Sequence, residues 1–440
     1  MAKYLITGGA PLHGSVKIFG AKNSSFKLMI AALLADSPST ISNICFIRDV
    51  VVVKQLIESL GGQANFGQNK TLTVEGASLK EFEVKKEFGE RSRASSMILP
   101  ILLHRFKEAK VPLPGGDHIG SRPIDRHIEG LKALGAQIKI EEGVILASAP
   151  NGLKGAEYTF PKNTHTGTET LILAAVMADG PTVLNNAAEE PEINDLINFL
   201  NKMGADIGRT GYRQITIKGV TSLKGADFEL MPDRNEAVTF ACAALATSGD
   251  VTVENAREEH LKAFLAKVGV AGGGYEIVEG GIRFYSKGNL QATNVETANY
   301  PGFMTDWQAP WVTLMTQAQG ESIVHERVFE NRFGYAAALK KMGAFIELFN
   351  PRLENRENFY EFNSTEAQKD SYHAAKITGP TKLHGADLVV DDIRAGATLT
   401  LAALVAQGDS VLENIELIER GYENLDGRLL SLGARIVKRT

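Results

Sequence analysis

Residues 167–204 read GTETLILAAVMADGPTVLNNAAEEPEINDLINFLNKMG, and their pattern shows how the chain is organised. Residues 167–178 are apolar on more than one face, which predicts a buried helix. In 181–187, β-branched residues alternate after a Gly-Pro turn and predict a strand. Residues 193–204 carry one apolar stripe and stop at Gly204, because glycine readily adopts the left-handed conformation that closes a helix. The stretch therefore predicts a helix, a strand and a second helix.

This pattern occurs six times along the 440-residue chain. Each copy closes on an apolar residue followed by glycine, and successive glycines lie 65 to 90 residues apart, which exceeds a solenoid period and matches a βαβαββ unit. Six such units suggest two domains of three, divided near Leu230. The closing pairs are Leu60-Gly61, Leu134-Gly135, Met203-Gly204, Val268-Gly269, Met342-Gly343 and Leu432-Gly433. The first helices are predicted to begin at Asn23, Arg93, Gly167, Asn235, Trp307 and Gly396, with further strands at 38–44, 249–256 and 408–415 and a further second helix at 126–135.

The longest spacing contains a polar insertion at about 346–379. Its low hydrophobicity predicts a solvated loop or an extended hairpin. We assign it no chemistry.

The overall composition is that of a globular protein, with 44% hydrophobic and 22% charged residues. The 47 Lys and Arg residues against 52 Asp and Glu residues give a net charge of -5, so no general cationic surface favours nucleic acid or an anionic membrane. No apolar run reaches the roughly 18 residues of a membrane span, and no leader sequence is evident. Cys45 and Cys242 lie far apart in apolar surroundings, which suggests structural thiols. We therefore expect a cytoplasmic protein that binds neither nucleic acid nor membrane.

Charged residues recur where the predicted buried helices begin. Lys22 precedes Asn23 and Ser24 at a helix N-terminus, whose free N–H groups attract phosphate or carboxylate. Taken alone, this segment is better explained by helix capping beside a solvated lysine. The recurrence changes that balance, because arginines gathered at one place cannot deprotonate and require an anion. The other charged residues at equivalent places are Arg93, Asp233, Arg234, Asp306, Asp392 and Arg394.

The segment 113–125, LPGGDHIGSRPID, is the most distinctive in the chain. Its prolines and glycines predict an exposed, mobile loop that can close over a ligand. A long hairpin connection with an Arg122 to Asp125 pair explains it equally well. His118 has no second histidine at metal-ligand spacing, so no zinc site is expected. Without a P-loop or a GxGxxG motif, nucleotide hydrolysis and dinucleotide redox chemistry have no support.

Motifs from one end of the chain to the other carry a family resemblance: GAKNSS at 20–25, SRASS at 92–96, LPGGDHIGSRPID at 113–125, AAEEPEINDL at 187–196, MPDRNEA at 231–237, TDWQA at 305–309, FENRF at 329–333, DIRAGA at 392–397 and ERGYENLDGRLLSLGA at 419–434. They resemble the enolpyruvyl transferases. GAKN together with GSRPID and RGYE favours the members that use a sugar nucleotide over those of the shikimate pathway. The resemblance implies a two-domain inside-out α/β barrel of six βαβαββ repeats. Its domains are expected at 22–230, with the catalytic loop, and at 1–21 plus 231–440.

The resemblance also implies an activity, the first committed step of peptidoglycan synthesis. The enolpyruvyl group of phosphoenolpyruvate would pass to the 3-hydroxyl of UDP-N-acetylglucosamine through a tetrahedral intermediate, with loss of phosphate and with no cofactor or metal. Asp306 is implied as the base for the sugar hydroxyl and Asp117 as the acid for C3. The implied clamp on phosphoenolpyruvate is Lys22, Arg122, Arg394 and Arg420. Positions implied to bind the sugar nucleotide are Lys22, Asn23, Arg93, Arg122, Pro123, Ile124, Asp125, Arg126, Asn163, Thr164, His165, Thr166, Asp306, Val328 and Arg332.

Two departures from the family pattern stand out. Most members carry cysteine at position 117, which epoxide antibiotics of the fosfomycin type alkylate. The pKa of an ordinary Asp is about 3.9 against about 8.5 for Cys, so Asp117 must be kept protonated by desolvation or by the bound anion. Residues 163–166, NTHT, lack the usual lysine and serine, although Lys162 lies one place earlier and His165 can replace one contact.

Two other classes of protein stay open. A pseudoenzyme would lose the clamp residues, which are all present here. A binding module for another nucleotide sugar is supported only by the altered segment 163–166.

Overall fold

The computed structural model describes residues 2–91, 93–115, 124–362 and 371–439. They form two compact units. The first unit contains the described residues between 20 and 231, and the second contains 2–19 with 232–439.

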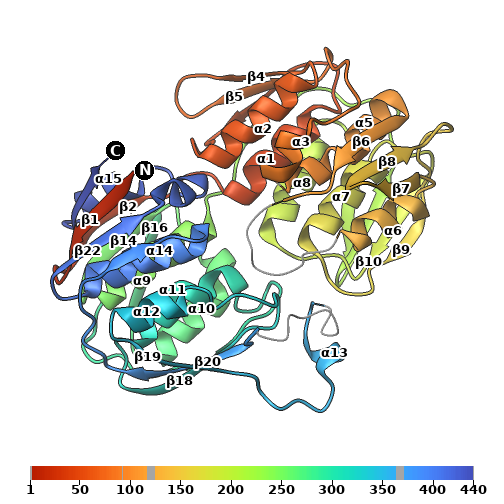
Figure 1. Cartoon of the computed structure of the whole chain (residues 1–440). Coiled ribbons are helices and arrows are strands. Elements are labelled where there is room, and N and C mark those ends of the chain that lie inside the picture. Colours follow the sequence, from red (N-terminus) through yellow and green to blue (C-terminus); the bar gives the residue numbers. More distant parts are fainter. Residues whose placement is uncertain (1, 92, 116–123, 363–370, 440) are drawn as a thin grey trace. The chain divides into compact units, whose positions relative to one another are not determined.

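The first unit is built from repeated helices and small sheets (Figure 1). Its elements are α1 (Lys22–Ala32), β3 (Ser39–Ser42), α2 (Arg48–Ser59), β4 (Gln63–Phe66), β5 (Leu72–Glu75), α3 (Lys86–Arg91), α4 (Ala94–Met97), α5 (Leu99–Phe106), β6 (Glu108–Pro112), α6 (Asp125–Ala133), β7 (Gln137–Glu141), β8 (Val144–Ser148), β9 (Glu157–Thr159), α7 (His165–Ala175), β10 (Pro181–Asn185), α8 (Pro191–Lys202), β11 (Asp206–Gly211), β12 (Gln214–Lys218) and β13 (Asp227–Glu229). The chain runs β9-α7-β10-α8-β11-β12, which is the βαβαββ order. Strand β10 pairs in parallel with β9 and antiparallel with β12.

The second unit repeats this order with both ends of the chain. Its elements are β1 (Lys3–Thr7), β2 (His13–Lys17), α9 (Arg234–Ala246), β14 (Asp250–Glu254), α10 (Glu258–Val270), β15 (Gly274–Val278), β16 (Gly281–Tyr285), β17 (Val295–Glu296), α11 (Thr305–Met315), β18 (Gly320–His325), α12 (Ala336–Lys341), β19 (Phe345–Phe349), α13 (Arg356–Phe359), β20 (Ala374–Gly379), β21 (Asp387–Val389), α14 (Ile393–Val405), β22 (Asp409–Glu413), the 3-10 helix η1 (Ile415–Arg420), α15 (Leu425–Ser431) and β23 (Arg435–Arg439). Strand β1 lies between β22 and β23, and β2 pairs in parallel with β14. The first strands therefore complete sheets formed by the last part of the chain.

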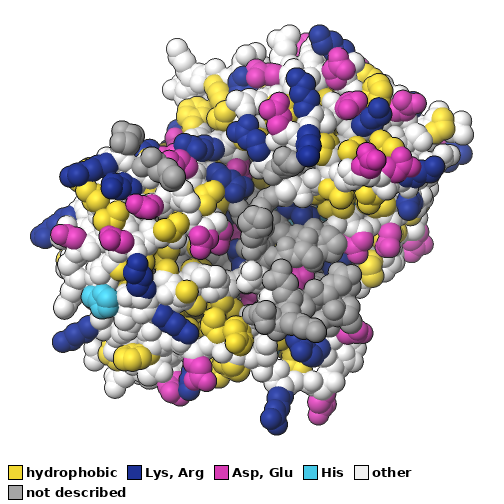
Figure 2. Space-filling model, viewed as in Figure 1, with side chains coloured by type: hydrophobic (Ala, Val, Ile, Leu, Met, Phe, Trp, Pro, Cys, Tyr) yellow, Lys and Arg dark blue, Asp and Glu magenta, His cyan; other side chains and the backbone are white. Residues whose placement is uncertain are grey.

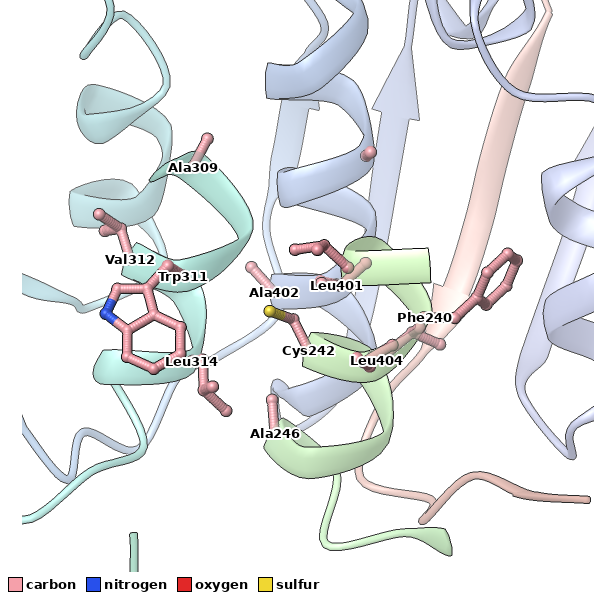
Figure 3. Packing of buried hydrophobic residues seen from close by; sticks show 14 of the residues in the cluster. Phe240, Cys242, Ala246, Ala309, Trp311, Val312, Leu314, Leu401, Ala402 and Leu404 are labelled. Carbon is pink, nitrogen blue, oxygen red and sulfur yellow. The ribbon is translucent and has the colours of Figure 1, made fainter. Parts of the chain in front are cut away.

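The first helix of each repeat lies inside its unit, and the sheets lie outside. Every residue of α9 is buried, whereas β12 and β14 alternate buried residues with residues that face outward. Figure 3 shows side chains of α9, α11 and α14, such as Cys242, Trp311 and Leu404, gathered in one core. Burial on all sides explains why the first helices have no polar face. The α/β class predicted from the sequence is confirmed.

The first helices and strands predicted from the repeats are confirmed, with one break. The helix predicted from Arg93 is divided into α4 and α5. Pro100 lies in the first turn of α5, where its missing N–H is tolerated, and it cannot donate the helical hydrogen bond to the carbonyl oxygen of Ser96 in α4.

One predicted closing glycine is wrong. Gly61, Gly204 and the other closing glycines have φ between 91° and 109°, whereas Gly269 lies inside α10. Helix α10 closes instead at Gly272, with φ 76°. The sequence VGVAGG offers three glycines, and the chain adopts the left-handed conformation at Gly272 and not at Gly269.

The polar insertion is a hairpin at its base, where β19 and β20 pair antiparallel. Its described part is not wholly solvated, because Tyr360 and Phe362 are buried with stacked rings 4.6 Å apart. His373 packs against both rings. The sequence did not predict this small aromatic cluster, because the average hydrophobicity of the insertion is low.

On the face shown in Figure 2, acidic and basic side chains are interspersed. No helix among the described residues is long and apolar enough to span a membrane.

Candidate functional site

In the second unit, Asp306 is held by two guanidinium groups. It is the second residue of α11, and its Oδ1 accepts a hydrogen bond from Arg332 Nη2. Its Oδ2 accepts a hydrogen bond of 3.4 Å from Arg394 Nη2. Both arginines are buried, while the Asp306 side chain remains 26% exposed. The pairing orients a carboxylate that is still accessible to a ligand.

Tyr422 holds the guanidinium of Arg394 by a second hydrogen bond. Its Nη1 donates to the Tyr422 hydroxyl at 2.7 Å, and that hydroxyl meets Thr239 Oγ1 at 2.8 Å. Burial alone would lower the pKa of Arg394, but Tyr422, Asp306 and Asp233 outweigh burial and raise it. Arg394 therefore stays charged in the protein interior.

Two other predicted residues of this unit lie in the turn after β18 and at the end of the 3-10 helix η1. Val328 follows β18, and its N–H donates to Glu326 Oε1 at 2.8 Å. Arg420 ends η1 two residues before Tyr422 and is half-buried.

In the first unit, Lys22 begins α1 and pairs with Asp49, with Nζ 2.8 Å from Oδ2. The capping interpretation of this segment is wrong. Asn23 and Ser24 lie inside α1, and the residue before the helix, Ala21, makes no side-chain cap. Lys22 is largely buried instead of solvated, so its charge is held in place.

The charges of Arg93 and Arg126 both act on the buried side chain of His127. The two ring nitrogens of His127 lie 2.9 Å from Thr170 Oγ1 and 3.1 Å from Thr166 Oγ1. Burial, together with the smaller effect of the Arg93 and Arg126 charges, lowers the pKa of His127 to about 3. His127 therefore stays neutral beside two cations.

The segment 163–166 is tied to the same group. Arg126 Nη1 donates to the Asn163 carbonyl oxygen at 2.9 Å. Thr164 caps α7 by accepting from the Gly167 N–H at 3.3 Å. The first turn of α7 therefore lies beside Arg126.

His165 belongs to a buried charged network. Lys27 Nζ lies 2.5 Å from Glu169 Oε1, and His165 Nε2 lies 3.0 Å from Lys27 Nζ and 3.2 Å from Glu169 Oε1. Burial and Lys27 lower the pKa of His165, but Glu169 outweighs them and leaves it raised. The network links α1, which carries Lys22, to the start of α7.

Two more predicted residues lie at the start of α6, directly before Arg126. Ile124 is buried at the start of α6, and Asp125 is exposed. Asp117, Arg122 and Pro123 lie outside the described residues.

Sequence reasoning missed several residues that hold these groups. Lys27 and Glu169 are charged residues inside otherwise apolar helical runs, and this signal could have singled them out. Glu326 and His127 gave no comparable signal. No cluster of three or more metal-binding side chains occurs in the described ranges.

The sequence is similar to known proteins over nearly its whole length. Residues 6–429 match the family described as EPSP synthase (3-phosphoshikimate 1-carboxyvinyltransferase). A relative from Halothermothrix orenii, named UDP-N-acetylglucosamine 1-carboxyvinyltransferase, is 42% identical over 438 residues and covers 100% of both chains. The chain belongs to the UDP-N-acetylglucosamine 1-carboxyvinyltransferase family. A relative with the family name from Trichlorobacter lovleyi is 41% identical over 436 residues, covering 99% of each chain.

Solved structures share the fold of this family. The enolpyruvyl transferase NikO from Streptomyces tendae is 23% identical with a TM-score of 0.85, covering 100% of this chain and 99% of its own. EPSP synthase from Acinetobacter baumannii is 18% identical with a TM-score of 0.71, covering 100% of both chains.

Proposed function

We propose that this protein transfers the enolpyruvyl group of phosphoenolpyruvate to the 3-hydroxyl of UDP-N-acetylglucosamine and releases phosphate. The reaction would be the first committed step of peptidoglycan synthesis, in the cytoplasm. The observation that carries the proposal is the accessible Asp306 carboxylate, oriented by Arg332 and Arg394, in a chain that matches its relatives end to end.

Asp306 acts as the general base in this proposal. Its carboxylate accepts the proton of the sugar 3-hydroxyl as the oxygen attacks C2 of phosphoenolpyruvate. Asp117 supplies a proton to C3, which gives a tetrahedral intermediate. Loss of a C3 proton to the resulting Asp117 carboxylate, with cleavage of the C2–O bond to phosphate, then restores the double bond and releases phosphate.

The clamp neutralises the negative charge of phosphoenolpyruvate. By family resemblance, Lys22, Arg122, Arg394 and Arg420 are assigned to its phosphate and carboxylate. Arg394 suits this role because Tyr422 and Asp306 hold its guanidinium before any substrate binds. Little reorganisation is then needed during the reaction.

Arg93 and Arg126 are assigned to the sugar nucleotide. Their two positive charges suit an anionic diphosphate, and both act on the neutral His127. The first turn of α7 and the backbone at Val328 are assigned further contacts. His165 offers the sugar nucleotide an imidazole that Glu169 and Lys27 hold in place.

The choice of acceptor tests the proposal. Phosphate release is measured with phosphoenolpyruvate plus either UDP-N-acetylglucosamine or shikimate 3-phosphate. We expect release with the sugar nucleotide only. Release with shikimate 3-phosphate, or with neither acceptor, would contradict the proposal.

A further inference from the structure

Glu326 shapes the turn that carries Val328. It follows β18 and is 1% exposed. Its Oε1 accepts hydrogen bonds from the N–H groups of Val328 at 2.8 Å and Phe329 at 3.1 Å. One buried carboxylate oxygen therefore fixes the backbone of this turn.

The other oxygen of Glu326 reaches the helix that carries Asp306. Oε2 accepts from Thr305 Oγ1 at 2.9 Å, and Thr305 is the first residue of α11. Arg332 Nε donates to the same hydroxyl at 3.3 Å, while Arg332 Nη2 donates to Asp306. The Thr305 hydroxyl thus connects Glu326 with Arg332, which itself holds Asp306.

The first turn of α11 depends strongly on these side chains. The residue before the helix, Met304, makes no side-chain cap. Pro310 has no N–H, so it cannot donate the helical hydrogen bond to the carbonyl oxygen of Asp306. The contact between Thr305 and Glu326 is a side-chain connection between this end of the helix and the turn after β18.

We propose that Glu326 and Thr305 are positioning residues that couple the sugar-nucleotide contact at Val328 to the placement of the Asp306 carboxylate. The inference rests on the proposed function, because it assigns the nucleotide to Val328 and the base to Asp306. Glu326 fixes the turn that would contact the nucleotide. Through Thr305 and Arg332, the same side chain also fixes the Asp306 carboxylate. Because proton transfer requires hydrogen-bond distance, a small displacement of the α11 start separates base from hydroxyl.

Thr305→Val and Thr305→Ser are the matched variants. Valine keeps the shape of threonine and removes the hydroxyl, while the bonds from Glu326 to Val328 and Phe329 remain. We expect Thr305→Val to lower kcat about tenfold or more, since a lost hydrogen bond to a charged group is worth about that factor. Its dissociation constant for UDP-N-acetylglucosamine, measured by calorimetry, should change less than about twofold. Thr305→Ser should restore kcat.

Glu326→Gln is the second variant. The amide cannot accept from both the turn and Thr305, so we expect weaker nucleotide binding together with lower kcat.

A purely structural role for Thr305 predicts a lower melting temperature with kcat unchanged in the folded fraction, or failure of serine to restore kcat. Either result overturns the inference while wild-type turnover keeps the proposed function intact. A wild-type protein without phosphate release overturns both.

Discussion

Lys27 Nζ lies 2.5 Å from Glu169 Oε1, and both side chains are excluded from solvent. Burying two charges is costly unless each remains compensated, so removing one partner leaves the other unpaired. We expect Lys27→Met to lower the free energy of unfolding by about 3–5 kcal/mol. Urea denaturation measures this change.

The double variant Lys27→Met with Glu169→Leu is the control for that experiment. Removing both charges should recover much of the lost stability, because an apolar pair of similar size can replace a buried ion pair. A double variant as unstable as the sum of the two single variants would show that the charges are not coupled.

His127 should make the protein sensitive to acid. Its pKa is lowered to about 3 in the folded protein, against about 6.5 for an ordinary histidine. The unfolded chain therefore binds more protons between these values, so stability is complete above about pH 6.5 and falls as the pH drops toward 3. Burial lowers the pKa of His104 and His373 to about 4, which acts in the same direction.

The measurement is the free energy of unfolding of wild type and His127→Gln between pH 7 and pH 4.5. The variant should be less stable at pH 7 and should lose less stability on acidification. The matched substitution His384→Gln, at an exposed histidine, controls for the change of residue type. Equal slopes for wild type and His127→Gln would contradict the account.

Asp306→Asn should remove turnover with little loss of nucleotide binding. The amide keeps the shape of the carboxylate but cannot accept the 3-hydroxyl proton. Phosphate release and nucleotide binding are measured on the same preparation. Near-normal phosphate release by this variant would reject the base assignment.

Because Asp117 stands where most members of the family carry cysteine, we expect the protein to resist fosfomycin. Alkylation by an epoxide needs a thiolate, and a carboxylate attacks far more slowly. The native cysteines should not substitute, since Cys45 and Cys242 are buried and burial raises the pKa of the Cys242 thiol.

Mass spectrometry after incubation with the drug should find no adduct on wild type and one adduct on Asp117→Cys. The variant should also keep activity, because a thiol can donate the proton. An adduct on the wild-type protein would show that position 117 has been misassigned.

The sequence predicted the inner helices because burial on all sides leaves a visible apolar run, as in α9. It could not locate the end of α10, since a glycine continues a helix or closes it according to the packing around it. Asp306 was recognisable from its motif. Its contacts with Arg332 and Arg394 were not, because three separate segments meet only when the second unit folds.

Transfer of an enolpyruvyl group to the sugar oxygen is measured most directly with an isotope label. Phosphoenolpyruvate labelled with ¹³C at C2 is incubated with the protein and UDP-N-acetylglucosamine, and the products are followed by NMR. We expect the label to appear in an enol ether on the 3-oxygen of the sugar, with one inorganic phosphate released for each ether formed. Label that remains in phosphoenolpyruvate, or that appears only in pyruvate, would contradict enolpyruvyl transfer.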